Sequence, residues 1–424
     1  MSLVFWRKQK FNLNHLFKIF SQRKMNILVI NAGSSSVKYQ LIDIITKQVA
    51  ASGIVERIGI EGSLVKHKYT LNGKTEKKEI SQPLSNHEEA LHIVSNLLID
   101  SEIGVISDPN DIKAVGHRVL HGGEKFTKTV LVTEEVKETI RELSPLGPLH
   151  MPANLAGIEV CEKVFPMAKQ VAVFDTSFHQ TMPEKAFRYA IPNKFYTENG
   201  IRAYGFHGTS HKFVYNEATK YLNNPNLKAI TLHLGNGASM AAVDTNQVKD
   251  TTMGMGPLSG LIMGTRSGDI DPSIIFYMAE ELGYTFNEVK DILNKESGML
   301  GISECSDARD VQANFEKGDP KAILCNDMYC YRIQKYIGAY VAALNGLDVL
   351  IFTGGIGEND DLIRKTVCTN LEYFGIEMDY QANDDKNHAS KIEELHTPNS
   401  KVKILIIPTN EELQIATETY ELVK

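Results

Sequence analysis

Two arginines of this chain lie beside glycines, in positions that suit the binding of anions. Arg118 stands in GHRVLHGGEKF, between two histidines, and Arg266 stands in GTRSGDIDP between Gly264 and Gly268. A guanidinium next to glycine-rich backbone can bind a carboxylate or a phosphate through two parallel hydrogen bonds. Either arginine alone could be an ordinary surface residue in a loop, but the two together predict an anionic substrate.

An aspartate and a histidine could also take part in phosphate chemistry. Asp175 follows the apolar run QVAVF, where a carboxylate could meet Mg²⁺ or polarise a reacting group, or simply cap a helix. His207 and His211 have the spacing of a zinc pair on a helix, but the glutamate of His-Glu-x-x-His is missing. We therefore expect His207 to donate to anionic oxygens at a helix start, where Thr209 or Ser210 can cap.

Three glycine-rich turns follow apolar runs: NAGSSSVK at 31–38, HLGNGAS at 233–239 and GGIGEN at 354–359. Glycine lets the backbone approach a ligand, and turn amides and hydroxyls can point toward phosphate. One such turn could be a plain hairpin, but three favour phosphate and nucleotide binding. Because Gly-x-x-x-x-Gly-Lys-Ser/Thr is absent and GNGASM breaks Gly-x-Gly-x-x-Gly, we expect neither a P-loop nor a dinucleotide-binding crossover.

The elements that must position these residues alternate between strands and helices, which is typical of an α/β fold. Met25–Asp43 and Ala229–Asp244 both read as strand, tight turn, strand, and this duplication predicts two related domains facing each other across a cleft. Two further segments, 349–359 and 402–413, begin with strand patterns. Helical patterns occur at 87–100, 272–282 and 331–347.

Composition excludes several classes of protein. The chain has 424 residues, of which 42% are apolar and 23% charged, and this composition is typical of a globular protein of two or three domains. Its net charge of −7 argues against non-specific nucleic-acid binding. No apolar run reaches the ~18 residues of a membrane span. Five scattered cysteines predict reduced, mostly buried thiols in a cytoplasmic protein.

The first 24 residues are basic and lie outside this pattern. They carry six lysines and arginines and no acid, so residues 25–424 hold a net charge of −13. The segment could be added or upstream sequence with Met25 as the ancestral start, a surface helix or tail, or a membrane-surface or targeting helix. We leave it unassigned.

Nine motifs in order resemble the acetate kinase (acetokinase) family. They are NAGSSSVKYQL, GHRVLHGGE, PLHMPAN, VFDTSFHQTMP, YGFHGTSH, HLGNGAS, GPLSGLIMGTRSGDIDP, FTGGIGEN and IPTNEEL, and they span roughly Met25 to Lys424. The resemblance implies two duplicated ribonuclease-H-like domains of the actin-like ATPase type with a nucleotide cleft between them. We predict domain I at 25–176 plus 408–424 and domain II at 177–407, in a homodimer.

The resemblance also implies roles for particular residues. Asp175, His207 and Arg266 would be catalytic, and Asn31 and Glu411 would hold Mg²⁺, or Mn²⁺ in its place. Arg118 would bind the acyl carboxylate, and the methyl pocket would consist of Leu120, Leu149, Phe206 and Pro257. The ATP-binding residues would be Lys38, His233, Leu234, Gly235, Asn236, Gly237, Asp307, Ala308, Arg309, Gly355, Ile356, Gly357, Glu358 and Asn359.

The implied reaction is reversible phosphoryl transfer from ATP to acetate, giving ADP and acetyl phosphate by direct in-line attack. A carboxylate needs no strong base, so Asp175 is expected to orient Mg²⁺-bound water or Arg118 rather than remove a proton. A propionate kinase would use the same chemistry. A sugar kinase would need a base for a hydroxyl, and an actin- or chaperone-like switch would hydrolyse ATP without a carboxylate acceptor. The two domains are expected to close around ATP. We expect no membrane and no nucleic acid among the partners.

Overall fold

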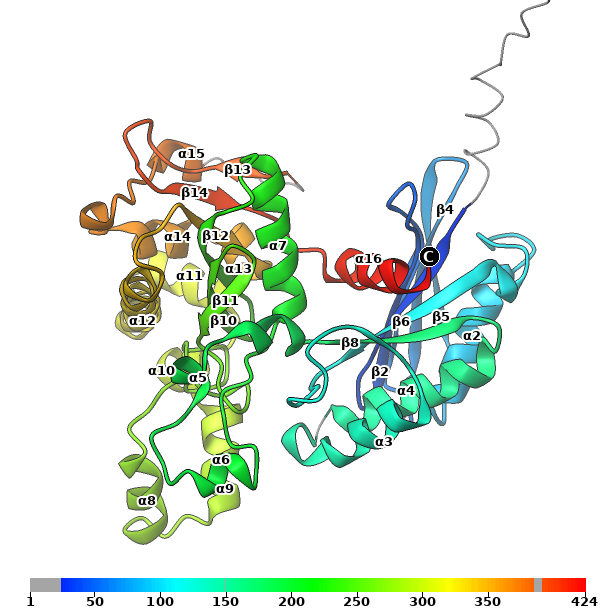
Figure 1. Ribbon diagram of the computed structural model, residues 1–424, viewed down its shortest axis with the longest axis horizontal. Coiled ribbons are helices and arrows are strands. Elements are labelled where there is room, and N and C mark those ends of the chain that lie inside the picture. Colours follow the sequence, from blue (N-terminus) through cyan, green and yellow to red (C-terminus); the bar gives the residue numbers. More distant parts are fainter. Residues whose placement is uncertain (1–23, 149, 385–390) are drawn as a thin grey trace, which may run out of the picture.

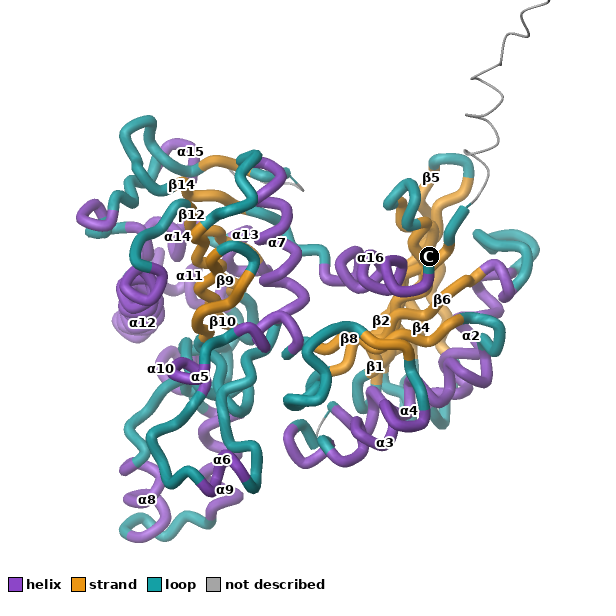
Figure 2. Tube along the Cα trace, in the orientation of Figure 1, coloured by secondary structure: helices purple, strands orange, loops and turns teal. Residues whose placement is uncertain are grey.

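The chain folds around two β-sheets in which five strands follow the same order. The computed structural model describes residues 24–148, 150–384 and 391–424. Predictions about residues 1–23 and Leu149 therefore fall outside the described residues. Figures 1 and 2 show the two sheets in separate lobes, with the last helix, α16 (Glu411–Val423), between them.

The first sheet has eight strands in the order β5-β4-β3-β2-β1-β6-β8-β7. Strands β1 and β2 form an antiparallel hairpin, and β1 pairs with β6 in parallel. The strands are β1 (Asn26–Ala32), β2 (Ser36–Asp43), β3 (Gln48–Glu56), β4 (Leu64–Leu71), β5 (Lys74–Ser81), β6 (Ile112–Val119), β7 (Val130–Leu131) and β8 (Lys169–Phe174).

The second sheet has the order β11-β10-β9-β12-β14-β13. Its hairpin β9–β10 is antiparallel, β9 pairs with β12 in parallel, and β12 pairs with β14 in parallel. The unit β11-β10-β9-β12-β14 thus repeats β3-β2-β1-β6-β8. The strands are β9 (Lys228–Leu234), β10 (Ala238–Asp244), β11 (Gln247–Thr251), β12 (Val349–Thr353), β13 (Glu393–Glu394) and β14 (Lys403–Ile406).

Helices cover both faces of each sheet. In the first half they are α2 (His87–Ile99), α3 (Glu134–Glu142) and α4 (Met151–Val164). In the second half, α7 (Gly208–Tyr221) packs on one face of the sheet and α12 (Pro320–Leu344) on the other. The further helices are α5 (Glu184–Phe187), α6 (Lys194–Thr197), α8 (Ser273–Glu280), α9 (Phe286–Asp291), α10 (Gly298–Ser303), α11 (Ala308–Glu316), α13 (Gly354–Asn359), α14 (Asp361–Cys368) and α15 (Tyr380–Asp384). Of these, α8 and α9 lie away from the sheet (Figure 1).

The central strands are apolar on both faces, as strands between two layers of helices must be. In the first sheet, Leu28 and Ile30 pack toward α2 and α4, whereas Ile27 and Val29 join the cluster that contains Ile415 of α16. In the second, the residues of β9 and β12 alternate between a cluster with α12 and a cluster with α7. Helix α16 therefore completes the first half, although it follows the second half in sequence.

The two predicted hairpins are present, but two helices differ from their predicted bounds. Helix α12 begins at Pro320 rather than near residue 331, because Asp319 caps it and proline suits a first turn. It ends at Leu344, since Asn345 takes the left-handed conformation (φ 51°). The GGIGEN segment is not a turn before a helix, because α13 begins directly at Gly354.

No helix among the described residues is long and apolar enough to cross a membrane. All five cysteines are free thiols and four of them are buried, as predicted. The domain boundaries at residues 176 and 407 stay a prediction.

Candidate active site

A cleft of about 670 Å³ lies within the second half of the molecule, at the carboxyl ends of β9 and β12. Four separate segments line it: the turn after β9, the loop at Gly264, the start of α11 with the two residues before it, and helix α13 with the residue after it. Eight of the residues predicted to bind ATP line this cleft, namely Gly235, Asn236, Asp307, Ala308, Arg309, Gly355, Ile356 and Asn359. The cleft position agrees with the general rule for α/β sheets, where ligands bind at the carboxyl ends of strands.

Two glycines are required by the shape of this cleft. Gly354 has φ +77°, and a Cβ on it would lie 2.7 Å from the carbonyl oxygen of Leu234, so α13 can begin against the end of β9 only with glycine here. A Cβ on Gly264 would lie 2.1 Å from Oδ1 of Asn236 and 2.9 Å from the carbonyl oxygen of Ser306. Gly264 therefore lets two walls of the cleft approach each other.

His207 and Arg266 converge on the turn after β9. The Cβ position of Gly237 lies 3.6 Å from both Nε2 of His207 and Nη1 of Arg266. Nη1 of Arg266 also donates to the carbonyl oxygen of Pro257 at 3.1 Å, which fixes the guanidinium. Two potential donors to phosphate thus meet beside the turn after β9, whose residues Gly235 and Asn236 line the cleft.

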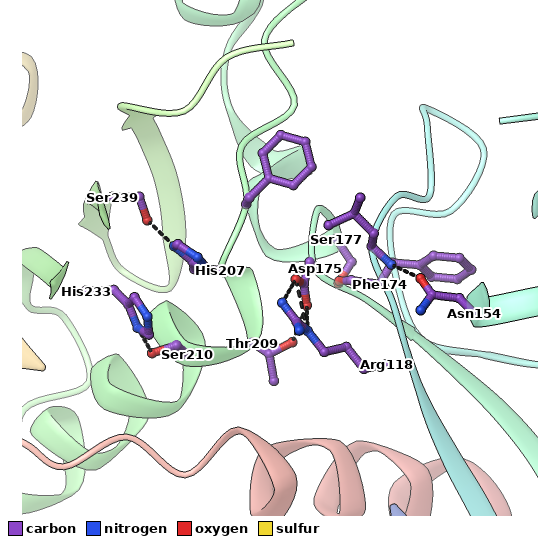
Figure 3. Close-up of polar contacts among 12 residues, drawn as sticks. Arg118, Asn154, Phe174, Asp175, Ser177, His207, Thr209, Ser210, His233 and Ser239 are labelled. Carbon is purple, nitrogen blue, oxygen red and sulfur yellow. Dashed lines mark hydrogen bonds and ion pairs between the residues drawn. The ribbon is translucent and has the colours of Figure 1, made fainter. Parts of the chain in front are cut away.

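The helix start around His207 differs from the prediction. His207 precedes α7 with φ 55°, and no side chain caps the helix, so the expected capping by Thr209 or Ser210 is wrong. The hydroxyl of Ser210 instead bonds Nδ1 of His233 and Oγ1 of Thr409, each at 2.8 Å. The rings of His207 and His233 lie 4.3 Å apart, and Figure 3 shows them side by side. No group of three potential metal ligands of the His, Cys, Asp or Glu type occurs among the described residues.

Asp175 and Arg118 form an ion pair at the edge of the first sheet. Asp175 follows β8 and is fully buried, and Arg118 lies on the neighbouring strand β6. Nε of Arg118 donates to Oδ1 at 3.0 Å and Nη2 donates to Oδ2 at 2.5 Å, as Figure 3 shows. The side chain of Asp175 is thus used in an ion pair and not as a helix cap. The third nitrogen of Arg118, Nη1, has no acceptor among the described residues.

The first residue of α16, Glu411, lies close to this ion pair. Burial raises the pKa of Glu411, the positive charges of Arg118 and Lys38 oppose that rise, and the negative charge of Asp175 adds to it. Lys38 stands directly opposite Asn31 in the β1–β2 hairpin. The hairpin turn of the first half therefore faces the start of α16. Asn31 and Glu411 each offer an oxygen ligand. Two such ligands fit Mg²⁺, which takes its other ligands from phosphates and water.

Apolar side chains predicted to contact a methyl group lie at the boundary of the two halves. Phe206 is 1% exposed and belongs to the core of the second half, and Leu120 packs against this core as well as against that of the first half. Pro257 is half-buried and accepts a hydrogen bond from Arg266. Leu149, the fourth predicted member, lies outside the described residues.

Not every predicted nucleotide residue lines the cleft. Lys38 lies on the first half, whereas His233, Leu234, Gly237 and Gly357 lie behind or beside the cleft wall. Glu358 accepts hydrogen bonds from the backbone N–H of Gly354 at 2.9 Å and of Thr409 at 3.0 Å, so it links α13 to the segment before α16.

Several residues of the site were missed by the sequence reasoning. Asn154, in the PLHMPAN motif, accepts from the Leu120 N–H at 3.0 Å and donates to the Ala32 carbonyl oxygen at 2.8 Å. It thus joins the loop after β6 to the end of β1. Ser239 bonds His207. The cleft itself is also lined by residues that carried no nucleotide prediction, namely Gly264, Ser306, Gln312 and Asp360.

The repeated sheets and the cleft define a two-domain α/β protein of the actin-like ATPase class. Comparison with known proteins narrows this class, because a sequence model of the acetokinase family matches residues 26–417. The chain belongs to the acetokinase family.

Relatives and solved structures agree with this assignment. The chain is 52% identical to an acetate kinase of Flavobacterium johnsoniae, over 94% of this chain and 100% of that one. It is similar to the crystal structure of an acetate kinase from Porphyromonas gingivalis, with a TM-score of 0.89 and 43% identity over 94% and 100% of the two chains. A propionate kinase structure from Francisella tularensis matches with a TM-score of 0.86 and 41% identity, over 94% and 100%.

Proposed function

We propose that the chain is an acetate kinase, which transfers the terminal phosphoryl group of ATP to acetate and gives ADP and acetyl phosphate. The observation that carries the proposal is the convergence of three cationic or donor groups at one end of the nucleotide cleft. His207 and Arg266 meet beside Gly237. Gly208, the residue after His207, donates its N–H to the carbonyl oxygen of Asp175 at 2.9 Å, and the carboxylate of Asp175 holds the guanidinium of Arg118. Arg118 therefore faces the same space from the other half.

The chemical problem at this site is the approach of two anions. At ~4 Å and an effective dielectric constant of about 20, each pair of unit like charges repels by about 4 kcal/mol. The acetate carboxylate is ionised at pH 7 and is itself the nucleophile, so no general base is needed. Catalysis then consists of alignment and of offsetting charge, which is what two arginines at the boundary of the halves can supply.

Arg118 would hold the acetate carboxylate in line with the phosphorus atom. Asp175 holds two nitrogens of this guanidinium, so its direction is fixed while Nη1 stays available for the substrate. Asp175 raises the pKa of Arg118, so the guanidinium keeps its charge. Asp175 is therefore proposed to orient Arg118, and it removes no proton in this mechanism.

Arg266 and His207 would act on the phosphoryl group. The Pro257 carbonyl oxygen positions Arg266, and the equatorial oxygens of the transferring group would lie between Arg266 and His207 as charge spreads over them. The methyl group of acetate would lie against Leu120, Phe206 and Pro257.

Asn31 and Glu411 would hold Mg²⁺ together with phosphate oxygens and water. Bound there, the ion would offset phosphate charge and orient the phosphates. Helix α16, whose first residue is Glu411, packs against β1 and β2, so Asn31 and Glu411 come from adjacent segments.

An assay of ADP formation across a series of acceptors tests the proposal. Acetate should support turnover, EDTA should abolish it and excess Mg²⁺ should restore it. Propionate measures acyl preference, since one methylene is worth only ~1–3 kcal/mol in such a pocket. Turnover with glycerol, or ADP release that is independent of any carboxylate, would refute the proposal in favour of a sugar kinase or an ATP-hydrolysing switch.

We further propose a homodimer, which light scattering can test. Helix α8 buries none of its own side chains, and Phe276 and Tyr277 on it are 56% and 59% exposed. The adjoining Leu282 and Phe286 are 56% and 70% exposed. Such an apolar surface supports a partner copy. Phe276→Asp should give monomers. The cytoplasmic location stays a prediction.

A further inference from the structure

His207 is one end of a chain of hydrogen bonds that runs into the interior of the second half. Its Nδ1 lies 2.8 Å from Oγ of Ser239, as Figure 3 shows. The same hydroxyl lies 2.8 Å from Nε2 of His211, whose Nδ1 lies 2.7 Å from Oγ1 of Thr231. Ser239, His211 and Thr231 are each 0% exposed.

The fold brings these four side chains together through simple periodicities. His207 and His211 are four residues apart, so they share one side of α7. Thr231 on β9 stands opposite Ala241 on β10, and Ser239 stands opposite His233, so these positions lie on one face of the sheet. Helix α7 packs on that face. Nothing in the proposed mechanism so far uses Ser239, His211 or Thr231.

When both imidazoles are neutral, the protons of this hydrogen-bonded series of side chains can be arranged in only two ways. Burial lowers the pKa of His207 and of His211 well below the ordinary value, and the like charges of His233, Arg118 and Arg266 add to this for His207. A neutral imidazole has one N–H and one acceptor nitrogen, and a hydroxyl has one proton. The hydroxyl of Ser239 has no other acceptor among the described residues, so it donates to one ring nitrogen and accepts from the other.

In the first arrangement, Thr231 donates to Nδ1 of His211, Nε2–H of His211 donates to Ser239, and Ser239 donates to Nδ1 of His207. The remaining proton of His207 is then on Nε2. In the reverse arrangement, Nδ1–H of His207 donates to Ser239, and Nε2 carries a lone pair. Thr231 must then send its proton to the Ala241 carbonyl oxygen at 3.4 Å, which is long for an O–H···O bond of ordinary ~2.5–3.0 Å.

The Nε2 atom is the one that matters for phosphate, because it lies 3.6 Å from the Cβ position of Gly237 beside Arg266. A lone pair there would repel phosphate oxygens, and an N–H would donate to them. The first arrangement therefore fits a bound phosphoryl group, and it supplies the donor without charging a buried ring.

We propose that Ser239, His211 and Thr231 are positioning residues that direct the proton of neutral His207 to Nε2, where it donates to the transferring phosphoryl group. No net proton moves between the protein and solvent: the three bonds keep one direction and end on the substrate. The kinetic consequence rests on the proposed acetate kinase function, whereas the protonation pattern does not.

Kinetics of Ser239→Ala test the proposal first. We expect kcat to fall roughly 10–100-fold, as for other residues that orient a functional histidine, with the KM values for ATP and acetate within about threefold of the wild type. Ser400→Ala is the matched control, because Ser400 is a buried serine of the same half that bonds the Val402 carbonyl oxygen at 2.7 Å. It should leave kcat unchanged. A Ser239→Ala enzyme with wild-type kcat would overturn the proposal.

A double-mutant cycle separates positioning from general structural damage. If Ser239 acts only through His207, then His207→Ala/Ser239→Ala should be no slower than His207→Ala, within about twofold. A structural role would instead give losses that multiply. Multiplying losses would contradict the proposal.

Nitrogen NMR of protein labelled with ¹⁵N-histidine reads the proton directly and requires no turnover. With Mg²⁺ and a non-hydrolysable ATP analogue bound, His207 should give the shifts of a neutral ring protonated at Nε2, assigned by loss of the signal in His207→Ala. Thr231→Val should weaken that preference. An imidazolium, or a neutral ring protonated at Nδ1, would overturn the proposal. Failure of acetate phosphorylation with the expected shifts would instead refute only the proposed function.

Discussion

The proposed nucleotide side and the proposed acyl side of the site are built in different ways. The nucleotide cleft is formed by segments of the second half alone, around the ends of β9 and β12. The acyl side combines Arg118 and Asp175 from the first half with His207 and Arg266 from the second. One region is formed within a single half, whereas the other is complete only through the relative position of two halves.

The two regions also handle charge differently. In the cleft, Asp307 caps α11 and forms an ion pair with Arg309, two residues further along the chain, so both charges come from one segment. On the acyl side, Asp175 fixes an arginine that is aimed at the other half. The difference predicts that changes in the cleft act on ATP affinity, whereas changes at the boundary act on kcat or on acetate affinity.

The largest effect is expected at Arg266. Arg266→Ala should lower kcat by roughly 10²–10³ or more, as the loss of one donor that acts in the transition state does, with a smaller change in the KM for acetate. Arg332→Ala is a suitable control, because Arg332 also bonds a backbone carbonyl oxygen, that of Gly260, but lies outside the proposed site. Reduced acetate affinity with kcat intact would contradict the role given to Arg266.

Arg118→Ala should act mainly on acetate. Loss of a charged contact to the substrate carboxylate is worth roughly 2 kcal/mol or more, which raises the KM for acetate about 30-fold or more while the KM for ATP changes little. Steady-state kinetics with each substrate varied in turn measure this. An unchanged KM for acetate would refute carboxylate binding by Arg118.

Gly264→Ala should act on ATP alone. The added methyl would meet Asn236 and the backbone of Ser306, and overpacking of ~1–3 kcal/mol corresponds to an increase of roughly 5- to 150-fold in the KM for ATP. Gly338→Ala is the matched control, since the nearest atom to its Cβ would be 3.7 Å away on Phe374. A change in acetate KM equal to that in ATP KM would remove the distinction between the two regions.

Asp360→Asn should act on the stability of the fold. Asp360 caps α14 through the Ile363 N–H, and burial raises its pKa to about 6. Between its unfolded value of 3.8 and about 6, the folded state holds the proton more tightly, so stability falls as pH rises and is lowest above pH 6. Above pH 6, ionised Asp360 lowers the free energy of unfolding by about 2–3 kcal/mol relative to low pH. Asparagine also caps a helix, so the variant should melt a few degrees higher at pH 8, with the gap closing toward pH 4. Equal melting temperatures at both pH values would contradict the raised pKa.

The sequence predicted the parts of the site that depend on local pattern. The two hairpins and the glycine turns were visible because strand alternation and turn residues are local signals. Arg118, His207 and Arg266 stood out by type and by nearby glycines, and Asp175 by its place after an apolar run; the structure brings them to one boundary.

What the sequence could not predict depends on register and packing. Ser239 bonds both His207 and His211 only because β10 is aligned with β9 in one register and α7 crosses that face. Thr209 and Ser210 looked like caps by position, but the hydroxyl of Ser210 is used by His233 and Thr409. The start of α12 at Pro320 carried a cap signal in Asp319 that the apolar pattern alone does not show.

Trapping of the product tests the central claim most directly. The protein is incubated with ATP, Mg²⁺ and acetate in the presence of hydroxylamine, which converts an acyl phosphate to a hydroxamate. The account predicts acetohydroxamate in an amount equal to the ADP formed, strong suppression in Arg118→Ala at the same low acetate concentration, and none with glycerol. ADP formation without hydroxamate would contradict it, since ATP would then be hydrolysed rather than used to phosphorylate a carboxylate.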